Sequence, residues 1–481
     1  MLDDPSLLKQ ACYIAGSWLG EAGQTVAVCN PATQQVLGRV SACGEALIDE
    51  ALNAAETAFK SWSASSAKDR SILLQAFARR MLEHKEDLAR IITLEQGKPL
   101  RESRGEVDYA ASYFSWFSQE ALRVRGELLE PPKPSQSITL LKKPLGVSAC
   151  ITPWNFPLAM LARKVAAALA AGCTVVAKPS ELTPFSGLVL GALAERVGLP
   201  KGVLNVLVGD PSEIGQAFCR SPIVKKISFT GSTRVGRILI EGSAQNIQKL
   251  SLELGGNAPF IVFEDAQLDS AIEGLMAAKF RNAGQTCISV NRLFVHESVY
   301  SNFVESLAQR MLALKCGNGL EDDTEIGPLV NDAALEKFNR HVSDALAKGA
   351  GLLCGGLSER RDLFVRPTLL VDARSDMLFN QEETFGPLLA AIPFKGDDEV
   401  LSLANSTPYG LAAYIYTANH SRIKRFQNQL EAGMLGINET SISNAAAPFG
   451  GIKCSGFGRE GSHYGIEEFL YLKYVLESEL R

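Results

Sequence analysis

The sequence has few histidines and no closely paired cysteines. Among its 481 residues, the five histidines include no two at metal-ligand spacing, and the ten cysteines form no CxxC pair. In a chain of this length, that cysteine pattern argues against a disulfide framework or a zinc knuckle. We therefore expect no metal site, and we expect a reducing, cytoplasmic setting.

An excess of positive charge and long apolar segments are also missing. The formal net charge is -5, whereas a nucleic-acid-binding protein needs a basic face. No apolar run is long enough to span a bilayer, and the first residues, Met1 to Pro5, lack the basic and apolar regions of a signal peptide. The sequence thus predicts no nucleic-acid partner and no membrane partner.

The remaining composition is that of an ordinary globular protein. Hydrophobic residues make up 46% and charged residues 21%, and the length allows two or three domains. After a proline-rich breaker at 131–134, short apolar strands alternate with helices. We expect strands at 146–152, 174–178, 203–208, 226–230 and 249–253, with helices at 160–171 and 183–197. This alternation is typical of parallel βαβ units, which bind ligands beyond the carboxyl ends of their strands.

A second α/β pattern follows Gly255 and Gly256. It has expected helices at 268–280 and 300–314 and an expected strand at 288–295, while residues 45–94 near the N-terminus read as helical. The run at 469–475 predicts a short strand near the end of the chain. That strand is either an exposed edge or a piece exchanged with a neighbouring molecule.

The first candidate for chemistry is Cys287, at the end of the segment Asn282 to Cys287. A cysteine just after a Gly-Gln-Thr turn, at the entrance to a strand, can be exposed. Helix ends or backbone amides would then activate it by lowering its pKa. The alternative is a buried, inert side chain, which is the interpretation we give to most of the other cysteines.

Two further motifs stand at expected strand ends. In Thr152 to Pro157, two prolines bracket Asn155, whose rigidly held amide could donate to a developing oxyanion. In Glu253 to Pro259, a half-buried Glu253 before paired glycines could have a raised pKa and act as a general base. The alternatives are a rigid aromatic turn and a solvated glutamate at a domain boundary.

Two segments compete as dinucleotide sites. Gly456 to Gly461 fits GxGxxG but does not open a βαβ unit, so we interpret it as a glycine-rich turn. Phe229 to Gly236 follows a strand and should open a helix, whose N-terminus can receive a pyrophosphate. Lys178 to Glu181, at another strand end, could hold a ribose. Ordinary capped strand-to-helix turns would explain the last two segments equally well.

Taken together, these motifs resemble the aldehyde dehydrogenase superfamily over nearly the whole chain. In the family's order they are PWNFP at 153–157, KPSELTP at 178–184, FTGSTRVG at 229–236, ELGGNAP at 253–259, NAGQTC at 282–287, EETFGP at 382–387 and PFGG at 448–451. Seven ordered motifs make coincidence an inadequate explanation.

The resemblance implies a covalent mechanism. Cys287, as a thiolate, would attack the aldehyde carbon, and the Asn155 amide with the Cys287 backbone N–H would hold the oxyanion. Hydride would pass to a nicotinamide and leave a thioester, for which Glu253 would activate water. Family members that transfer the acyl group to coenzyme A generally lack this glutamate, so its presence favours hydrolysis to the free acid.

The resemblance also assigns dinucleotide contacts. The implied residues are Lys178 and Glu181 at the adenine ribose, Gly231 and Ser232 at the pyrophosphate, Glu383 and Phe385 at the nicotinamide ribose, and Trp154 and Phe449 shaping the site. Glu181 predicts a preference for NAD, with NADP possible as a second cofactor. A 2′-phosphate would meet like charge there, at a cost of about 1 kcal/mol in water and about 4 kcal/mol at a screened interior dielectric.

Finer likeness points to the succinate-semialdehyde dehydrogenase branch. In that branch two arginines and a serine grip the remote carboxylate of the substrate, and the matching positions are Arg163, Arg281 and Ser443. Guanidinium groups make charge-assisted bonds to carboxylates, although either arginine could instead form a structural ion pair. Leu158 and the stretch around Ser443 depart from the branch, so glutarate semialdehyde and a sulfonated small aldehyde stay open as substrates.

The fold class that follows is α/β, with three parts. We expect a parallel-sheet dinucleotide-binding domain at 1–122 and 142–254, an α/β catalytic domain at 255–454, and a small β oligomerisation element at 123–141 and 467–481. The resemblance implies a homodimer or homotetramer built through that element. The rival functions are a cysteine hydrolase, which lacks an evident histidine base near the thiol, and a non-catalytic binding protein.

Overall fold

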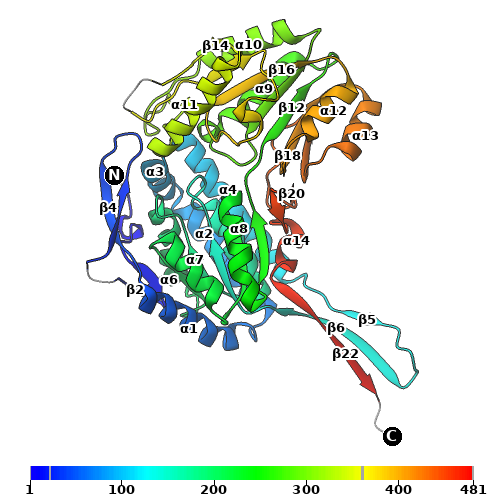
Figure 1. The fold of residues 1–481 in the computed structure, drawn as a ribbon. Helices are drawn as coiled ribbons and strands as arrows, with labels where there is room; N and C mark the ends of the chain where they lie inside the picture. The colour runs from blue at the N-terminus through cyan, green and yellow to red at the C-terminus, as the bar shows by residue number, and fades with distance from the viewer. Residues whose placement is uncertain (1, 21–22, 359–361, 479–481) are drawn as a thin grey trace.

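The computed structural model describes residues 2–20, 23–358 and 362–478, which form two α/β units and a projecting arm (Figure 1). Each unit is built on its own mainly parallel sheet with separate hydrophobic core clusters. The α/β fold class expected from the sequence is therefore confirmed. No helix in these ranges is long and apolar enough to cross a membrane.

The first unit contains a sheet of eight strands in the order β2-β1-β9-β8-β7-β10-β11-β21. The strands are β1 (Cys12–Ile14), β2 (Ser17–Leu19), β7 (Val147–Ile151), β8 (Thr174–Lys178), β9 (Leu204–Val206), β10 (Val224–Thr230), β11 (Lys249–Glu253) and β21 (Gly456–Phe457). The five neighbouring strands β9-β8-β7-β10-β11 are parallel. The pairs at the two edges, β2-β1, β1-β9 and β11-β21, are antiparallel. Beside this sheet, β3 (Thr25–Cys29) and β4 (Val36–Ser41) form a separate hairpin.

Helices cover this sheet. They are α1 (Glu45–Trp62), α2 (Ala67–Glu83), α3 (Lys85–Gln96), α4 (Leu100–Ala121), α5 (Ala159–Ala171), α6 (Pro184–Val197), α7 (Pro211–Arg220), α8 (Thr233–Ser243) and α14 (Ser462–Glu467). The expected continuous helical region at 45–94 is three helices, because Ser66 caps a new helix and the chain turns again at His84. Both α5 and α6 end at glycines in the left-handed conformation, Gly172 and Gly198.

The strand order creates a crevice at one edge of the sheet. From β7 the chain adds β8 and β9 on one side, and it then returns to add β10 and β11 on the other. Because the order reverses between β7 and β10, the segments after their carboxyl ends diverge and leave room for a ligand. Asn155 follows β7 and Ser232 follows β10, so the topology places both beside this crevice.

The second unit contains a seven-stranded sheet in the order β14-β15-β16-β13-β12-β18-β19. Its strands are β12 (Ala258–Val262), β13 (Val290–His296), β14 (Gly351–Cys354), β15 (Thr368–Val371), β16 (Leu388–Phe394), β18 (Ala412–Tyr416) and β19 (Met434–Ile437). Its helices are α9 (Leu268–Phe280), α10 (Tyr300–Leu312), α11 (Asp332–Ala347), α12 (Asp397–Asn405) and α13 (His420–Gln429). The short strands β17 (Tyr409–Gly410) and β20 (Ile452–Lys453) pair separately.

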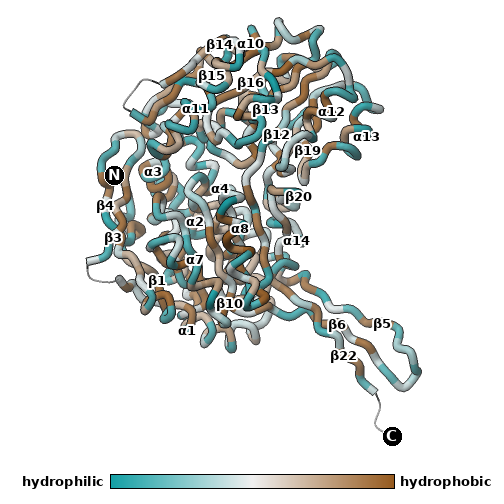
Figure 2. The backbone as a smooth tube through the Cα atoms, viewed as in Figure 1, coloured by the Kyte–Doolittle hydropathy of each residue, from teal (hydrophilic) through white to brown (hydrophobic). Residues whose placement is uncertain are grey.

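The arm is a three-stranded antiparallel sheet of β5 (Glu127–Leu129), β6 (Gln136–Pro144) and β22 (Leu470–Ser478). It extends away from the first unit, and polar and apolar segments lie along it (Figures 1 and 2). The strand expected at 469–475 is therefore real, and it is an edge strand paired with β6 of its own chain. β6 also runs beyond residue 141, the last residue of the first expected arm segment.

Candidate active site

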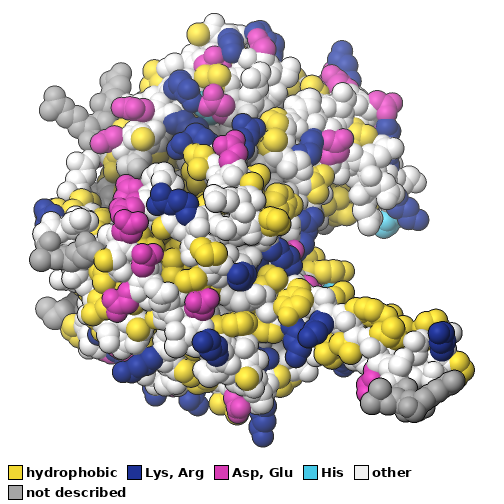
Figure 3. Space-filling view, turned by 60° about the horizontal axis from the view of Figure 1, so that its bottom comes forward, with side chains coloured by type: hydrophobic (Ala, Val, Ile, Leu, Met, Phe, Trp, Pro, Cys, Tyr) yellow, Lys and Arg dark blue, Asp and Glu magenta, His cyan; other side chains and the backbone are white. Residues whose placement is uncertain are grey.

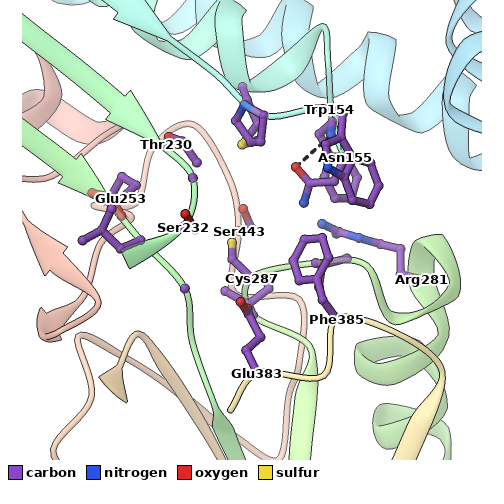
Figure 4. A pocket seen from close by; sticks show the side chains of 18 of the residues that line it. Trp154, Asn155, Thr230, Ser232, Glu253, Arg281, Cys287, Glu383, Phe385 and Ser443 are labelled. Carbon is purple, nitrogen blue, oxygen red and sulfur yellow. Dashed lines mark hydrogen bonds between the residues drawn. The ribbon is translucent and has the colours of Figure 1, made fainter. Parts of the chain in front are cut away.

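A cavity of about 360 Å³ lies between the two units. Twelve of the fourteen site residues expected from the sequence line it, namely Trp154, Asn155, Arg163, Gly231, Ser232, Glu253, Arg281, Cys287, Glu383, Phe385, Ser443 and Phe449. Figure 4 shows several of these side chains converging from segments that are far apart in the sequence. The other two, Lys178 and Glu181, lie at and just beyond the carboxyl end of β8, the strand next to β7.

The loop that carries Cys287 has an unusual backbone. Asn282, Ala283 and Gly284 all have positive φ angles, of 52°, 54° and 75°. Helices α3 and α4 hold this conformation, since the Asn282 backbone N–H donates to Glu102 Oε2 at 2.7 Å and Gln96 Nε2 donates to Asn282 Oδ1 at 2.9 Å. Backbone strain of this kind persists only where surrounding contacts impose it, and it is common at functional sites.

The environment of the Cys287 thiol differs from the expected one. Burial raises the pKa of Cys287 to about 12, and Glu383 and Glu253 add to the increase. Arg163 lowers this pKa, but its effect is smaller than the cost of removing a thiolate from water. The expectation that helix ends and backbone amides lower the pKa of Cys287 is therefore wrong. The charge that favours the thiolate comes first from Arg163 and then from Arg281.

Asn155 is held in one orientation beside the Cys287 loop. Its Oδ1 accepts from the Phe156 backbone N–H at 3.1 Å, and its Nδ2 donates to the Gln285 carbonyl at 3.0 Å. Lys98 stabilises the turn, because its Nζ donates to the Asn155 carbonyl at 2.6 Å and pairs with Glu106. An amide nitrogen has two N–H groups, so Asn155 keeps a second donor for an oxyanion.

Glu253 ends β11 directly beside Thr230, its register partner at the end of β10. Its side chain is buried, and neither carboxylate oxygen has a hydrogen-bond partner among the described residues. Burial, and then the charge of Glu460, raise the pKa of Glu253 well above its ordinary value. A buried carboxyl with a raised pKa and free oxygens can accept a proton from water.

The other side of the cavity fits a dinucleotide. Ser232 caps α8, where its Oγ accepts from the Val235 N–H at 3.3 Å, and Gly231 precedes it at this helix N-terminus. Glu383 Oε1 accepts from the Gly256 N–H at 3.2 Å, and a Cβ at Gly255 would approach the other Glu383 oxygen to 2.8 Å. The glycine pair therefore leaves room for a carboxylate that can bind ribose hydroxyls.

Aromatic rings and an ion pair complete this side. The rings of Trp154 and Phe385 meet edge to face, with centroids 5.6 Å apart. At the end of β8, Lys178 Nζ lies 2.7 Å from Glu181 Oε2, so one cation and one carboxylate stand together where a second ribose could bind. These donors and acceptors match the chemistry of a nicotinamide dinucleotide.

Arg163 is less free than the sequence suggested. Its guanidinium forms a buried ion pair with Glu460, which also pairs with Lys164, and it stacks on the Phe449 ring at 4.5 Å. Arg163 therefore does form the structural ion pair that the sequence left open as an alternative. Nη1 of Arg163 has no hydrogen-bond partner among the described residues, so one edge of the group can still bind an anion.

Arg281 and Ser443 complete this end of the cavity. Arg281 stacks on the Phe156 ring at 4.7 Å and extends toward Asn155 (Figure 4). The Ser443 hydroxyl lies 2.6 Å from the hydroxyl of Tyr109, which also lines the cavity. The arrangement offers two cations and hydroxyl groups to a negatively charged substrate.

Sequence reasoning missed Tyr109, Lys164 and Glu460. Glu460 belongs to the glycine-rich segment interpreted as a turn, and the structure has such a turn, with β21 pairing with β11 beside Glu253. The partners Lys164 and Glu460 are 296 positions apart. The sequence offers one signal, an acidic residue in a glycine-rich segment and two basic residues in an alanine-rich helix. That pattern does not specify that the residues make contact.

Comparison with known proteins agrees with this geometry. The model of the aldehyde dehydrogenase family matches residues 18–475. The chain is 50% identical to 3-sulfolactaldehyde dehydrogenase from Pseudomonas putida, with 98% of each chain covered. It is 49% identical to glutarate-semialdehyde dehydrogenase from P. putida and 49% identical to succinate-semialdehyde dehydrogenase [NADP(+)] from Escherichia coli, with 98% of this chain and 99% of each relative covered.

A solved structure shows the same likeness. The crystal structure of succinate-semialdehyde dehydrogenase from Burkholderia pseudomallei superimposes with a TM-score of 0.98 at 50% identity, covering 99% of this chain and 100% of the other. These matches span almost every residue that forms the two units and the cavity between them. The chain therefore belongs to the aldehyde dehydrogenase family, whose members oxidise aldehydes with NAD(P).

Proposed function

We propose that this aldehyde dehydrogenase oxidises succinate semialdehyde to succinate and prefers NAD. The observation that carries the proposal is the presence of Arg163, Arg281 and Ser443 in the same cavity as Cys287. A buried guanidinium edge without a partner is costly, and the carboxylate of a short aldehyde would satisfy it. The same residues are those that the succinate-semialdehyde branch would use.

Two other anionic aldehydes are supported by relatives of nearly equal identity. One relative is named for glutarate semialdehyde and one for 3-sulfolactaldehyde. Guanidinium groups bind carboxylate and sulfonate alike, so the arginines select an anion and leave the acid group to the rest of the pocket. Succinate semialdehyde is our first choice because its branch shares the segments Ala162 to Val165 and Phe280 to Cys287.

The first half of the proposed reaction builds a covalent adduct. The Cys287 thiolate attacks the carbonyl carbon and forms a thiohemiacetal, whose oxyanion is stabilised by Asn155 Nδ2. The positive charge of Arg163 favours the thiolate against the cost of burial. When bound, NAD would accept the hydride that the former aldehyde carbon loses as the thiohemiacetal becomes a thioester. Trp154, Ser232, Glu383 and Phe385 would hold NAD.

The second half releases the acid. Glu253 accepts a proton from water, and the resulting hydroxide attacks the thioester carbonyl, so that the carbon–sulfur bond breaks and Cys287 is regenerated. The raised pKa of Glu253 makes it a stronger base than an exposed glutamate. The unpartnered carboxylate oxygens keep their hydrogen-bonding capacity for that water.

The cofactor preference rests on Glu181. Its carboxylate pairs with Lys178, and it can accept hydrogen bonds from ribose hydroxyls but would repel a 2′-phosphate. The E. coli relative is named for NADP, so a shared fold does not decide the cofactor. Lys178 could partner a phosphate, and we expect measurable turnover with NADP as well.

Family members are typically oligomeric, and the arm offers a surface for association. We propose a homodimer or homotetramer assembled through β5, β6 and β22, with the arm as the oligomerisation element. Large apolar side chains are exposed on this arm, including Leu128, Tyr471, Leu472 and Tyr474. Figure 3 shows hydrophobic side chains gathered along it.

The test is NADH or NADPH formation with a panel of aldehydes. We expect the highest kcat/KM for succinate semialdehyde, lower values for glutarate semialdehyde and sulfolactaldehyde, much lower values for butanal, and a higher value with NAD than with NADP. Cys287→Ala should abolish turnover. Faster oxidation of butanal than of every anionic aldehyde would refute the role of the arginines, and turnover by Cys287→Ala would refute the mechanism.

A further inference from the structure

Three hydroxyl groups form a hydrogen-bonded row at the wall of the active-site cavity. The Tyr109 hydroxyl lies 2.6 Å from the Tyr113 hydroxyl and 2.6 Å from Ser443 Oγ. Tyr109 and Tyr113 are one turn apart on α4, whereas Ser443 comes from the loop after β19. Tyr109 and Ser443 line the cavity, and Tyr113 is fully buried.

The number of protons in the row determines which hydroxyl has one left to donate. Three hydroxyls carry three protons, but the row contains two hydrogen bonds, so one proton is left over. If Tyr113 accepted from Tyr109, the spare proton would be its own. That proton has no other acceptor among the described residues, and a buried donor without an acceptor is costly.

The favoured arrangements are therefore those in which Tyr113 donates to Tyr109. Tyr109 then either donates to Ser443 or accepts from it. In the first case the Ser443 proton is free, in the second case the Tyr109 proton is free, and both of these groups line the cavity. Burial raises the pKa of Tyr113 well above its ordinary value, so Tyr113 keeps the proton that orders the row.

The packing of the tyrosines fixes the position of the row. Their rings meet edge to face with centroids 4.9 Å apart, and the Tyr113 ring stacks on Phe117 at 6.4 Å. Tyr109 therefore has little freedom to turn its hydroxyl away from Ser443. The donor is held in place before a ligand arrives, which reduces the entropy lost on binding.

We propose that Tyr109 is a specificity-determining residue, which together with Ser443 presents one hydroxyl donor to the anionic end of the substrate. The inference rests on the proposed function, because it requires an anion in the cavity. The anion would meet Nη1 of Arg163, the guanidinium of Arg281 and this hydroxyl. Tyr113 acts through Tyr109 and is a positioning residue.

The experiment compares succinate semialdehyde with butanal, an uncharged aldehyde of the same chain length. In Tyr109→Phe the ratio of their kcat/KM values should fall a few-fold, mainly through KM for the anionic substrate, because Ser443 can still donate but loses the hydroxyl that positions it. Ser443→Ala should give a similar fall. Tyr113→Phe should give a smaller one, because Tyr109 can still pair with Ser443.

The double variant Tyr109→Phe/Ser443→Ala tests whether the two hydroxyls act as one donor. We expect the ratio to fall about tenfold, more than the two single losses combined, since either hydroxyl alone can still donate and only the double variant lacks the donor. The matched control is Tyr300→Phe, which removes a hydroxyl that donates to the Ala391 carbonyl and accepts from the Asp372 N–H, and which should leave the ratio unchanged because Tyr300 does not line the cavity. Thermal unfolding of each variant separates folding defects from specificity.

Three outcomes would overturn the inference. An unchanged ratio in Tyr109→Phe would remove its role, as would equal losses for both aldehydes, which indicate a structural effect. Additive losses in the double variant would show two independent contacts. If the unsubstituted enzyme does not prefer succinate semialdehyde to butanal, the proposed function itself fails, and that result is read before any variant is made.

Discussion

Glu253, which is buried, and Glu383, which is half-buried, are both acids of the cavity, but their surroundings prepare them for different tasks. Glu253 has no hydrogen-bond donor among the described residues and sits close to the negative charge of Glu460. Glu383 accepts from the Gly256 N–H, and burial raises its pKa to about 7. The environment of Glu253 favours uptake of a proton. Glu383 ionises near neutral pH and is a carboxylate above it.

The pKa of Glu383 predicts a pH-dependent affinity for NAD. Below about pH 7 the carboxyl is protonated, and above it the carboxylate can accept two ribose hydroxyl bonds. The Kd for NAD, followed by fluorescence quenching, should therefore decrease several-fold as pH rises through 7. Glu383→Gln should bind more weakly and lose this pH step, while Glu253→Gln should keep it. A flat profile in the unsubstituted enzyme would contradict the assignment.

Single residues also show the limit of sequence reasoning. Cys287, Asn155 and Glu253 could be picked out because each follows a turn or strand end with a recognisable pattern. The ion pair between Arg163 and Glu460 could not, because pairing across such a distance in the chain depends on how β21 meets β11. The same holds for the raised pKa of Cys287, which depends on burial by both units.

At the scale of elements, the turn between β11 and β12 packs against Cys287, the proposed nucleophile. Gly256 packs so closely that an added Cβ would clash with the Cys287 carbonyl oxygen. Gly105, on the exposed surface of α4, has nothing within 4 Å of the same position. The two glycines therefore form a matched pair for testing how sensitive the reaction is to the Cys287 backbone.

Gly256→Ala should displace Cys287 and lower kcat by about a hundredfold, the loss expected when a reacting atom moves by roughly 1 Å. Gly105→Ala should leave kcat unchanged and stabilise α4 by up to about 1 kcal/mol. Steady-state kinetics and thermal unfolding measure both effects. Equal kcat values in the two variants would show that this turn does not position the nucleophile.

The elements themselves were only partly predictable. The parallel strands and helices from β7 to β11 have strong apolar periodicity, and the expected ranges agree with them within a few residues. The N-terminal strands β1 to β4 are short and mixed in polarity, so their pattern is weak. The order of strands in either sheet depends on long-range packing, which periodicity does not encode.

At the scale of the whole molecule, the arm has a strand edge and apolar side chains that a single chain does not cover. Its strand β22 is an open edge, and Leu472 and Leu128 are 61% and 82% exposed. Exposed edges and large apolar patches are costly in water unless another molecule covers them. Both properties favour contact with a second copy of the chain.

Leu472→Asp should therefore weaken association, because it places a charge in the proposed contact. We expect light scattering during size-exclusion chromatography to show a smaller species than for the unsubstituted protein. Leu312→Asp is the control, since Leu312 is 70% exposed at the end of α10. An unchanged mass for Leu472→Asp would exclude this part of the arm from the interface.

The return of the chain to the first sheet has a consequence for its synthesis. A ribosome makes β21 and Glu460 after both sheets have their other strands, so the nascent first unit holds Arg163 and Lys164 without their acidic partner. Burying those cations unpaired costs several kcal/mol. A prematurely released chain would therefore stay open to proteases, and only a nearly finished one could close around Glu253.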